Sequence, residues 1–318
     1  MSQPTATIRQ ERQTMRAIVQ REYGTSDVLL LEEVDRPLIA DDEVLVRVAA
    51  AGIDRGTWHL MAGQPYLMRC VGFGFRRPKG SIPGRDVAGT VEEVGVNVSR
   101  FAIGDAVFGI SKGSLAQYAR AQEDRLVAMP DTLSYEQAAV LATSGLTALQ
   151  ALADVGRVRS GQHVLIVGAS GGVGTFAVQI AKVLGAEVTA VCSTSKLDLV
   201  RSIGADHVID YRREDFAKGS SRYDVILDVG GCSSLSRLRR ALTPTGTLVM
   251  VGGEGGRWTG MGRQLKAVAL SPFVGQRLAM KTPKETAADL ERLARLLLDG
   301  QLTPVLDRTF PLEEAAEA

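Results

Sequence analysis

The stretch Val164-Leu-Ile-Val-Gly-Ala-Ser-Gly-Gly-Val-Gly174 decides the fold of this chain. It opens with apolar residues typical of a buried strand and leads into a helical pattern that ends near Leu184. Its glycines permit a tight turn and a close backbone approach to a pyrophosphate, which the N–H groups at the start of the helix would bind. The alternative is a tight turn that binds no ligand. The predicted cofactor contacts are Ala169, Ser170, Gly171, Gly172, Val173 and Gly174.

The segments around this turn repeat the alternation of strand and helix. Such a series predicts a parallel sheet covered by helices, because parallel neighbours need a crossover connection. The predicted strands are His163–Val167, Glu187–Cys192, His207–Asp210, Tyr223–Asp228 and Gly246–Val251, and the predicted helices are Val173–Leu184, Lys196–Ile203 and Ser233–Leu242.

The chain before about residue 135 has a different character. Short alternating stretches predict strands, and glycines and prolines separate them. Ser134 is placed to cap a helix from Tyr135 to Leu152. Near the other end, Thr282–Leu298 has the leucine spacing of an amphipathic helix, and Gln301–Phe310 is expected to be extended. The predicted early strands are Arg16–Gln20, Glu43–Val48, Asp86–Val94 and Ala106–Gly109.

Composition narrows the class of protein. The 318 residues suffice for about two domains, and 37 basic against 36 acidic residues give no electrostatic case for nucleic acid as a partner. Three cysteines without a CxxC pair favour a reducing, cytoplasmic setting. Residues 1–14 lack an apolar run and are expected to be a disordered leader. Ser160–Ala181 carries no charge, but its glycines divide it into strand, turn and helix, so no membrane span is expected.

The end of the second strand of this series bears on the choice of cofactor. NAD sites place an acid about 20 residues after the glycines, where it accepts from the ribose 2′-OH. Here Ser193, Thr194 and Lys196 follow the strand, and hydroxyls with a lysine suit the 2′-phosphate of NADP(H). Tyr211, after the next strand, could add a phenolic donor. The alternatives are that Lys196 only begins a helix and that Tyr211 is an ordinary strand-end aromatic.

Several short motifs occur in an order characteristic of one superfamily. They are Ala51-Gly-Ile-Asp54, Gly84-Arg-Asp-Val-Ala-Gly89, Gly104-Asp-Ala-Val-Phe-Gly109, Gly113-Ser-Leu-Ala-Gln-Tyr118, Ala142-Thr-Ser-Gly-Leu-Thr-Ala148, the glycine turn and Gly204-Ala-Asp-His-Val-Ile-Asp-Tyr211. From about Met15 onward the chain resembles the medium-chain dehydrogenase/reductase superfamily, in its zinc-free quinone oxidoreductase branch. The resemblance implies an α/β protein. Residues 15–135 and 276–318 would form a GroES-like, mostly β catalytic domain, and residues 136–275 a Rossmann domain with a doubly wound parallel sheet.

The resemblance also implies where the cofactor would lie, in a cleft between the two domains. Homodimers are common in this family, so we expect a homodimer. Similar proteins run on past Ala318 into a further strand that completes the catalytic domain, so its absence bears on both stability and the affinity for NADPH. The residues implied for the cofactor are Thr143, Thr147, Val251 and Gly252 beside the nicotinamide, and Ser193, Lys196 and Tyr211 beside the 2′-phosphate.

A catalytic zinc ion is not expected. Zinc-dependent relatives carry Cys and Gly-His-Glu where this chain has Asp54 and Gly84-Arg-Asp86, so a thiolate and a histidine ligand are missing. Without a Lewis acid, hydride donation to a conjugated acceptor is easier than alcohol oxidation, because the acceptor spreads the incoming charge. The predicted reaction is therefore NADPH-dependent reduction of a small hydrophobic quinone or α,β-unsaturated carbonyl. The alternatives are an alcohol dehydrogenase-like enzyme of the same fold and an NADPH-binding sensor without turnover.

Candidates for the proton donor lie just after the first of these motifs. His59 could act as a general acid near neutral pH, and Tyr66 could donate to a carbonyl oxygen. Asp54 could accept from either of them, or pair with Arg55 or Arg85. The alternatives are that His59 is a buried histidine satisfied by the protein, that Tyr66 only lines the pocket, and that solvent supplies the proton.

Overall fold

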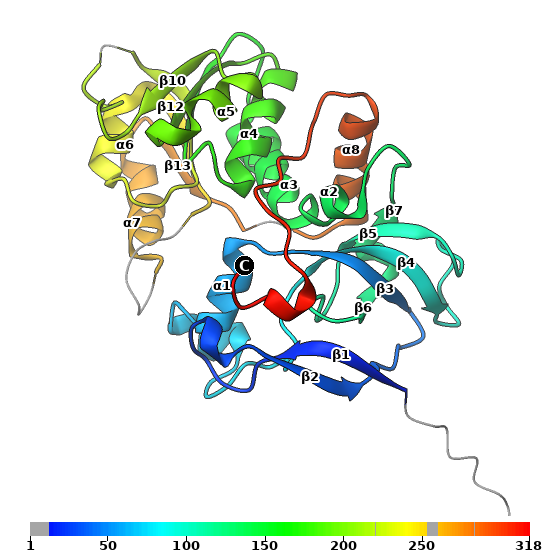
Figure 1. Cartoon of the computed structure of the whole chain (residues 1–318). Helices are drawn as coiled ribbons and strands as arrows, with labels where there is room; N and C mark the ends of the chain where they lie inside the picture. Colours follow the sequence, from blue (N-terminus) through cyan, green and yellow to red (C-terminus); the bar gives the residue numbers. More distant parts are fainter. Residues whose placement is uncertain (1–12, 220, 253–259, 283) are drawn as a thin grey trace, which may run out of the picture.

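The structure is a computed structural model that describes residues 13–219, 221–252, 260–282 and 284–318. Helices around a parallel sheet form one part of the molecule in Figure 1, and antiparallel strands form the other. The expected disordered leader lies outside the described residues, except for its last two positions. The second of these, Thr14, already begins strand β1 (Thr14–Val19).

Six strands form a fully parallel sheet in the order β10-β9-β8-β11-β12-β13. The chain winds outward from β8 in one direction and then from β11 in the other, which is the doubly wound arrangement predicted from the sequence. The fold class is therefore confirmed. The strands are β8 (His163–Val167), β9 (Glu187–Cys192), β10 (His207–Asp210), β11 (Tyr223–Asp228), β12 (Leu242–Met250) and β13 (Arg277–Met280).

Helices cover this sheet. Helix α4 (Gly172–Val183) is buried from Gly174 to Ala181, because it lies between the sheet and α3 (Ala142–Leu149). A helix buried on most of its surface needs mostly apolar residues, and the two polar residues buried in α4, Thr175 and Gln179, hydrogen-bond to backbone carbonyls. The other helices of this part are α5 (Leu197–Ser202), α6 (Leu235–Ala241) and α7 (Gly262–Leu270).

The GroES-like part is built on an antiparallel sheet in the order β6-β3-β4-β5-β7, and β1 pairs with β2 beside it. Buried valines such as Val44, Val87 and Val107 fill its core. The mostly β architecture expected for this part of the chain is therefore confirmed. The remaining strands are β2 (Leu30–Asp35), β3 (Glu43–Gly52), β4 (Asp86–Val94), β5 (Ala106–Ile110), β6 (Tyr118–Gln122) and β7 (Leu126–Ala128). The sequence analysis did not predict helix α1 (Arg55–Ala62), nor the π-helical turn at Arg69–Phe73 that follows it.

The single helix predicted from Tyr135 to Leu152 is wrong. The chain forms α2 (Tyr135–Ala139), then α3, then a π-helical turn at Gln150–Gly156. Ser134 does cap α2, since its Oγ accepts from the Gln137 amide at 3.3 Å. Val140 leaves the helical conformation with ψ near 1°. This break lets α2 pack on the antiparallel sheet while α3 packs against α4.

The expected return to the catalytic domain at residue 276 stays a prediction, but the strand just after that position belongs to the parallel sheet. Residues Arg277–Met280 form the sixth strand of the parallel sheet, where Leu278 pairs with Leu248 and is buried with it in one core. Apolar burial at the edge of the sheet explains this placement. We propose that the nucleotide-binding part extends to Met280. Residues Gln301–Phe310 form no strand, and Thr303 is held instead by the side chain of Gln179 on α4.

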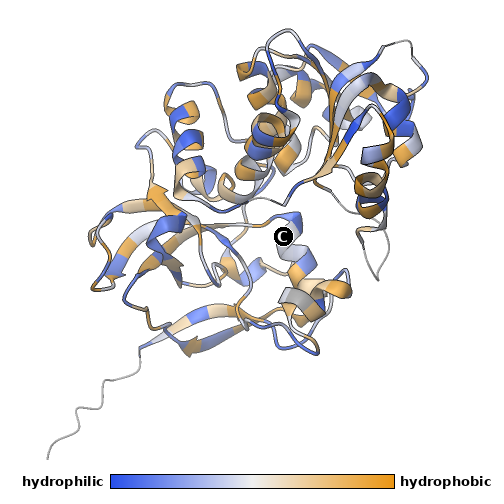
Figure 2. Ribbon diagram, turned by 180° about the vertical axis from the view of Figure 1, so that it is seen from behind, coloured by the Kyte–Doolittle hydropathy of each residue, from blue (hydrophilic) through white to orange (hydrophobic). Residues whose placement is uncertain are grey.

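The amphipathic helix predicted near the end is present as α8 (Ala287–Leu298), with Leu290, Leu293 and Leu297 buried. It packs so closely on α3 that a Cβ on Gly145 would come within 2.9 Å of Leu293. The chain then returns to the antiparallel part, as the red segment in Figure 1 shows. In Figure 2, polar and apolar residues alternate along the helices and strands of both parts.

Candidate active site

The glycine turn joins β8 to α4 at the carboxyl edge of the parallel sheet. Gly168 has a φ of 87°, a conformation that other residues adopt only with strain. A Cβ on Gly174 would lie 2.1 Å from the Gly168 carbonyl oxygen, so α4 begins directly against the turn. No side chain caps α4 at Gly171, and the first-turn amides of a helix have no acceptor within it. This end of α4 therefore suits an anion such as a pyrophosphate.

The ends of β9 and β10 lie next to the glycine turn. The Gly168 and Ala169 amides donate to the Val191 carbonyl at 3.1 and 3.0 Å, and the Tyr211 amide donates to the Cys192 carbonyl at 3.2 Å. Parallel strands that end together place their following residues at one edge. The structure therefore brings together the predicted phosphate-side residues Ser193, Thr194, Lys196 and Tyr211.

An acid that the sequence analysis missed lies at this edge. Asp210 ends β10, and it accepts hydrogen bonds from Thr194 Oγ1 at 2.5 Å and from the Arg212 amide at 3.0 Å. The bond from Thr194 outweighs burial and holds the pKa of Asp210 below its ordinary value. Thr194 is thus turned toward a carboxylate of the protein. Lys196 Nζ lies 3.1 Å from Asp307 Oδ1, so a carboxylate already faces the lysine predicted to bind a phosphate.

The backbone after β12 is fixed by a buried ion pair. Asp228, at the end of β11, is fully buried and pairs with Arg263 of α7. Burial raises the pKa of Asp228, and the charge of Arg263 opposes that shift. The carbonyl of Gly252 accepts from Arg263 at 3.3 Å and from Gln264 Nε2 at 2.9 Å. A Cβ at Gly252 would lie 1.9 Å from the Val229 carbonyl oxygen, so only glycine fits there. The sequence analysis named Val251 and Gly252 but missed these side chains that hold them.

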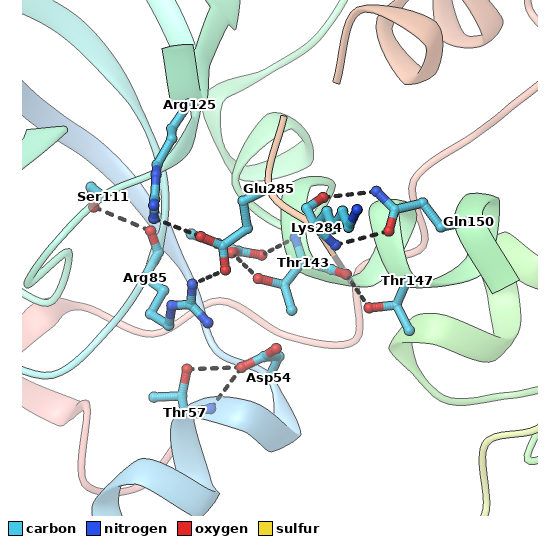
Figure 3. A network of polar contacts seen from close by, with 11 residues as sticks. Asp54, Thr57, Arg85, Ser111, Arg125, Thr143, Thr147, Gln150, Lys284 and Glu285 are labelled. Atoms are coloured by element: carbon cyan, nitrogen blue, oxygen red, sulfur yellow. Dashed lines mark hydrogen bonds and ion pairs between the residues drawn. The ribbon is translucent and has the colours of Figure 1, made fainter. Parts of the chain in front are cut away.

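A second buried acid joins the two parts of the molecule. Asp86, at the start of β4, is 3% exposed and accepts from the Thr143 amide at 2.9 Å and from the Thr143 hydroxyl. Thr147 Oγ1 donates to the Thr143 carbonyl at 2.7 Å, one turn further along α3. Figure 3 shows Thr143 and Thr147 side by side on this helix. The two threonines predicted beside the nicotinamide are thus anchored to a carboxylate that the sequence analysis weighed only as a zinc-ligand position.

The neighbours of Asp86 are engaged as well. Asp54 caps α1 by accepting from the Thr57 amide at 2.8 Å and the Thr57 hydroxyl at 2.9 Å. Arg85 pairs with Glu285, and Arg125 pairs with the same carboxylate at 2.7 Å (Figure 3). Each of these side chains is therefore committed to a partner within the protein.

The residues around Glu285 tie the chain segment before α8 to both parts. The Gln150 side chain donates to the Lys284 carbonyl at 2.7 Å and accepts from the Lys284 amide at 2.9 Å. Gln150 also donates to Asp289 at 2.8 Å. Because Glu285 binds two arginines of the antiparallel part and Lys284 binds Gln150, just after the end of α3, this short segment holds the two parts together.

The predicted proton donors His59 and Tyr66 lie on and just after α1. His59 Nδ1 is 3.0 Å from the Gln64 carbonyl oxygen, and its ring meets Trp58 edge-on at 5.1 Å. The Tyr66 ring contacts the Arg69 guanidinium at 4.7 Å. Both residues therefore help to shape the segment after α1, and their role as proton donors stays a prediction.

Among the described residues, no three His, Cys, Asp or Glu side chains are grouped so that they could hold a metal ion. In the same part of the chain, no helix has the length and apolar character needed to cross a membrane.

Comparisons with known proteins place the chain in a family. Residues 40–131 match the model of the alcohol dehydrogenase GroES-like domain, and residues 203–318 match that of the zinc-binding dehydrogenase. The chain is 32% identical over 321 residues to a chloroplast envelope quinone oxidoreductase homolog of Arabidopsis thaliana, covering 96% of this chain and 93% of that protein. It is 31% identical over 324 residues to a quinone oxidoreductase of Sus scrofa, covering 96% and 92%.

Solved structures agree with these matches. The quinone oxidoreductase from Coxiella burnetii superposes with a TM-score of 0.85 at 28% identity, and CurK enoyl reductase with a TM-score of 0.84 at 27% identity. Each comparison covers 96% of this chain and 94% of the other. The chain therefore belongs to the medium-chain dehydrogenase/reductase superfamily, in its quinone oxidoreductase-like branch. It is an oxidoreductase of that family.

Proposed function

We propose that the chain is a zinc-independent, NADPH-dependent oxidoreductase that transfers hydride to a small hydrophobic quinone or α,β-unsaturated carbonyl. The observation that carries this proposal is the shared edge of the parallel sheet. There the glycine turn, the Ser193–Lys196 segment and the fixed backbone at Gly252 come together next to α3. A pyridine nucleotide supplies the hydride when it is bound there.

Different residues at this edge would hold different parts of a dinucleotide. The α4 amides would hold the pyrophosphate, and Ser193, Lys196 and Tyr211 would hold the 2′-phosphate. Asp210, which could otherwise favour a free ribose 2′-OH, is already bound to Thr194 and a backbone amide. Thr143 and Thr147 would orient the nicotinamide from the opposite side of the site.

Zinc independence is supported by what the side chains at the metal positions do in this chain. Asp54 caps a helix, and Arg85 pairs with Glu285. Asp86 binds Thr143. A guanidinium is always protonated and cannot act as a metal ligand, so the site lacks a full set of donors for catalytic zinc. The names of the relatives, quinone oxidoreductase and enoyl reductase, support conjugated acceptors as substrates.

The test is nucleotide oxidation by the purified chain with a panel of quinones and enones, using NADPH and NADH in parallel with a chelator present. Chelator-resistant turnover that prefers NADPH supports the proposal. Turnover abolished by the chelator, or oxidation of alcohols in preference to reduction of enones, would favour an alcohol dehydrogenase-like enzyme. NADPH binding without turnover of any acceptor would favour a sensor.

We propose a homodimer on separate grounds. Strand β13 is the edge of the parallel sheet, and beside it α7 and the following turn expose Leu265, Val268 and Phe273. Exposed apolar side chains next to an unpaired strand edge favour association. Light scattering after size-exclusion chromatography gives the molar mass, and a monomer would contradict this expectation.

A further inference from the structure

Asp86 is 3% exposed, and backbone packs closely on one side of its side chain. Gly52 of β3 pairs with Asp86, and a Cβ on Gly52 would come within 3.0 Å of the Asp86 Cβ and 2.2 Å of the Ala139 carbonyl oxygen. The backbone of α2 therefore closes that side. The Asp86 carboxylate meets Thr143, which is only partly buried, whereas Ala142 and Ser144 on either side are buried. Thr143 therefore connects the buried carboxyl group of Asp86 to the candidate active site.

The charges around Asp86 favour its neutral form. Burial acts most strongly, the negative charge of Asp54 adds to it, and together they raise the pKa of Asp86 to about 7. The two hydrogen bonds from Thr143 and the positive charge of Arg85 oppose this shift without cancelling it. Arg85 is shared with Glu285, which also binds Arg125. Near neutral pH the carboxyl group therefore exchanges a proton within the working range of an enzyme.

The hydrogen bonds allow that proton to move. When Asp86 is ionised, the Thr143 hydroxyl donates to it. When Asp86 is protonated, it can donate to the Thr143 oxygen, because a hydroxyl both donates and accepts. The Thr143 hydroxyl is then free to donate toward the site. The same short turn of α3 contacts the cofactor turn, since a Cβ on Gly172 would come within 2.9 Å of Ser144 Oγ.

We propose that Asp86 and Thr143 form a proton relay of the reductase, in which Asp86 stores the proton and the Thr143 hydroxyl delivers it to the reduced substrate. This inference rests on the proposed function. Reduction of an enone at its β-carbon leaves an enolate that needs a proton at its α-carbon. Thr143 Oγ1 gives its proton to that carbon and takes one from the Asp86 carboxyl group. Asp86 is left as a carboxylate and regains a proton from water. Each turnover therefore consumes one proton, which becomes the hydrogen of the new C–H bond at the α-carbon. Thr143 is the catalytic residue here, and Asp86 is a positioning residue that acts through it.

The test uses the full chain and the best enone of the panel, and follows kcat and KM from pH 5.5 to 9. In the wild type, kcat is expected to fall as the pH rises through about 7, because Asp86 then loses its proton. Asp86→Asn is expected to lower kcat about 100-fold and to remove the fall of kcat at alkaline pH. The KM for NADPH should stay unchanged within about twofold. Thr143→Val should show the same fall in kcat and the same loss of pH dependence, whereas Thr143→Ser keeps the hydroxyl and should keep the pH dependence. The double variant should be no slower than the slower single variant.

A second readout needs no turnover. Infrared difference spectra of the cofactor-free protein between pH 6 and pH 8 should show the carbonyl stretch of a protonated carboxylic acid, and Asp86→Asn should lack that band. Asp206→Asn is the matched control, because Asp206 lies at the amino edge of the parallel sheet, opposite the carboxyl edge that forms the site. This variant should keep both the infrared band and the kcat. Two results would overturn the relay while leaving the proposed function in place. The first is an active wild type with an Asp86→Asn variant whose kcat is within twofold of it, and the second is an unchanged fall of kcat at alkaline pH in that variant. If the wild type reduces no acceptor, the proposed function falls and the relay falls with it, and the infrared band then shows only whether Asp86 holds a proton.

Discussion

Replacing Asp86 with asparagine is expected to stabilise the folded protein at alkaline pH and to give no such gain in acid. The pKa of this carboxyl group is raised from 3.8 to about 7 in the folded protein. The folded state therefore binds a proton at Asp86 more tightly than the unfolded state, and the contribution of Asp86 to stability is fully present below about pH 4. Stability is lost as the pH rises toward 7, because folding must then bury an anion. Asparagine does not titrate, so the variant escapes this loss.

The magnitude follows from the shift. A tenfold change in the proton equilibrium corresponds to about 1.4 kcal/mol, so burying the ionised carboxylate costs on the order of 4 kcal/mol above pH 7. Asparagine keeps one oxygen for the Thr143 amide and offers an N–H₂ to the Thr143 hydroxyl, which must turn round. That rearrangement costs about 1 kcal/mol. The net gain expected at pH 8.5 is therefore about 2–3 kcal/mol, and at pH 4 the variant should be about 1 kcal/mol less stable than the wild type.

Urea denaturation of both proteins at pH 4, 5.5, 7 and 8.5 measures the difference in the free energy of unfolding. Asp206→Asn provides a control of opposite sign. Burial acts to raise the pKa of Asp206, but Lys182 at 2.7 Å and the Val188 amide at 2.7 Å outweigh it and lower that pKa. The control should lose stability at neutral pH and lose less in acid. A constant difference between Asp86→Asn and the wild type across all four pH values would refute the reasoning.

Three further changes probe the cofactor edge. Lys196→Ala should raise the KM for NADPH about tenfold and leave that for NADH unchanged, as initial rates with both nucleotides will show. Asp307→Asn removes the carboxylate 3.1 Å from Lys196, which would otherwise compete with the 2′-phosphate for that lysine. The variant should lower the KM for NADPH about twofold to threefold, and a higher KM would show that Asp307 does not compete. Gly174→Ala places a Cβ 2.1 Å from the Gly168 carbonyl oxygen and should destabilise the fold by about 2 kcal/mol or more and abolish nucleotide binding, measured by urea denaturation and by fluorescence titration. Near-normal NADPH binding by that variant would show that α4 can move away from the turn.

The parallel sheet could be predicted from the sequence because its signals are local. Each strand is a short apolar run, and the glycine turn has a spacing that few other structures need. The break at Val140 could not be predicted in the same way. Residues on both sides of it favour a helix, and the break arises because α2 packs on the antiparallel sheet whereas α3 packs against α4. Tertiary packing there overrides local preference.

The site was harder to predict because its contacts join distant parts of the chain. Asp86 and Thr143 are 57 residues apart, and Arg85 and Glu285 are 200 apart. The place of Asp210 could not be predicted from one strand end alone for a related reason. It ends β10, and the parallel sheet sets this residue beside Cys192 at the end of β9. The acids at neighbouring strand ends of a parallel sheet therefore belong to one site.

The contacts of Lys284 and Glu285, which hold the two parts of the molecule together, have a consequence for the design of chimeric proteins. A chimera made by exchanging the nucleotide-binding part between two parents would bring Gln150 from one parent and the segment after Met280 from the other. The two hydrogen bonds between the Gln150 side chain and Lys284 use only the backbone of Lys284, so any parent's main chain satisfies them. The Glu285 contacts use the side chains of Arg85 and Arg125, so these three residues must be inherited together. The exchangeable module is therefore the antiparallel part taken with its returning C-terminal segment, joined at two crossovers and not at one.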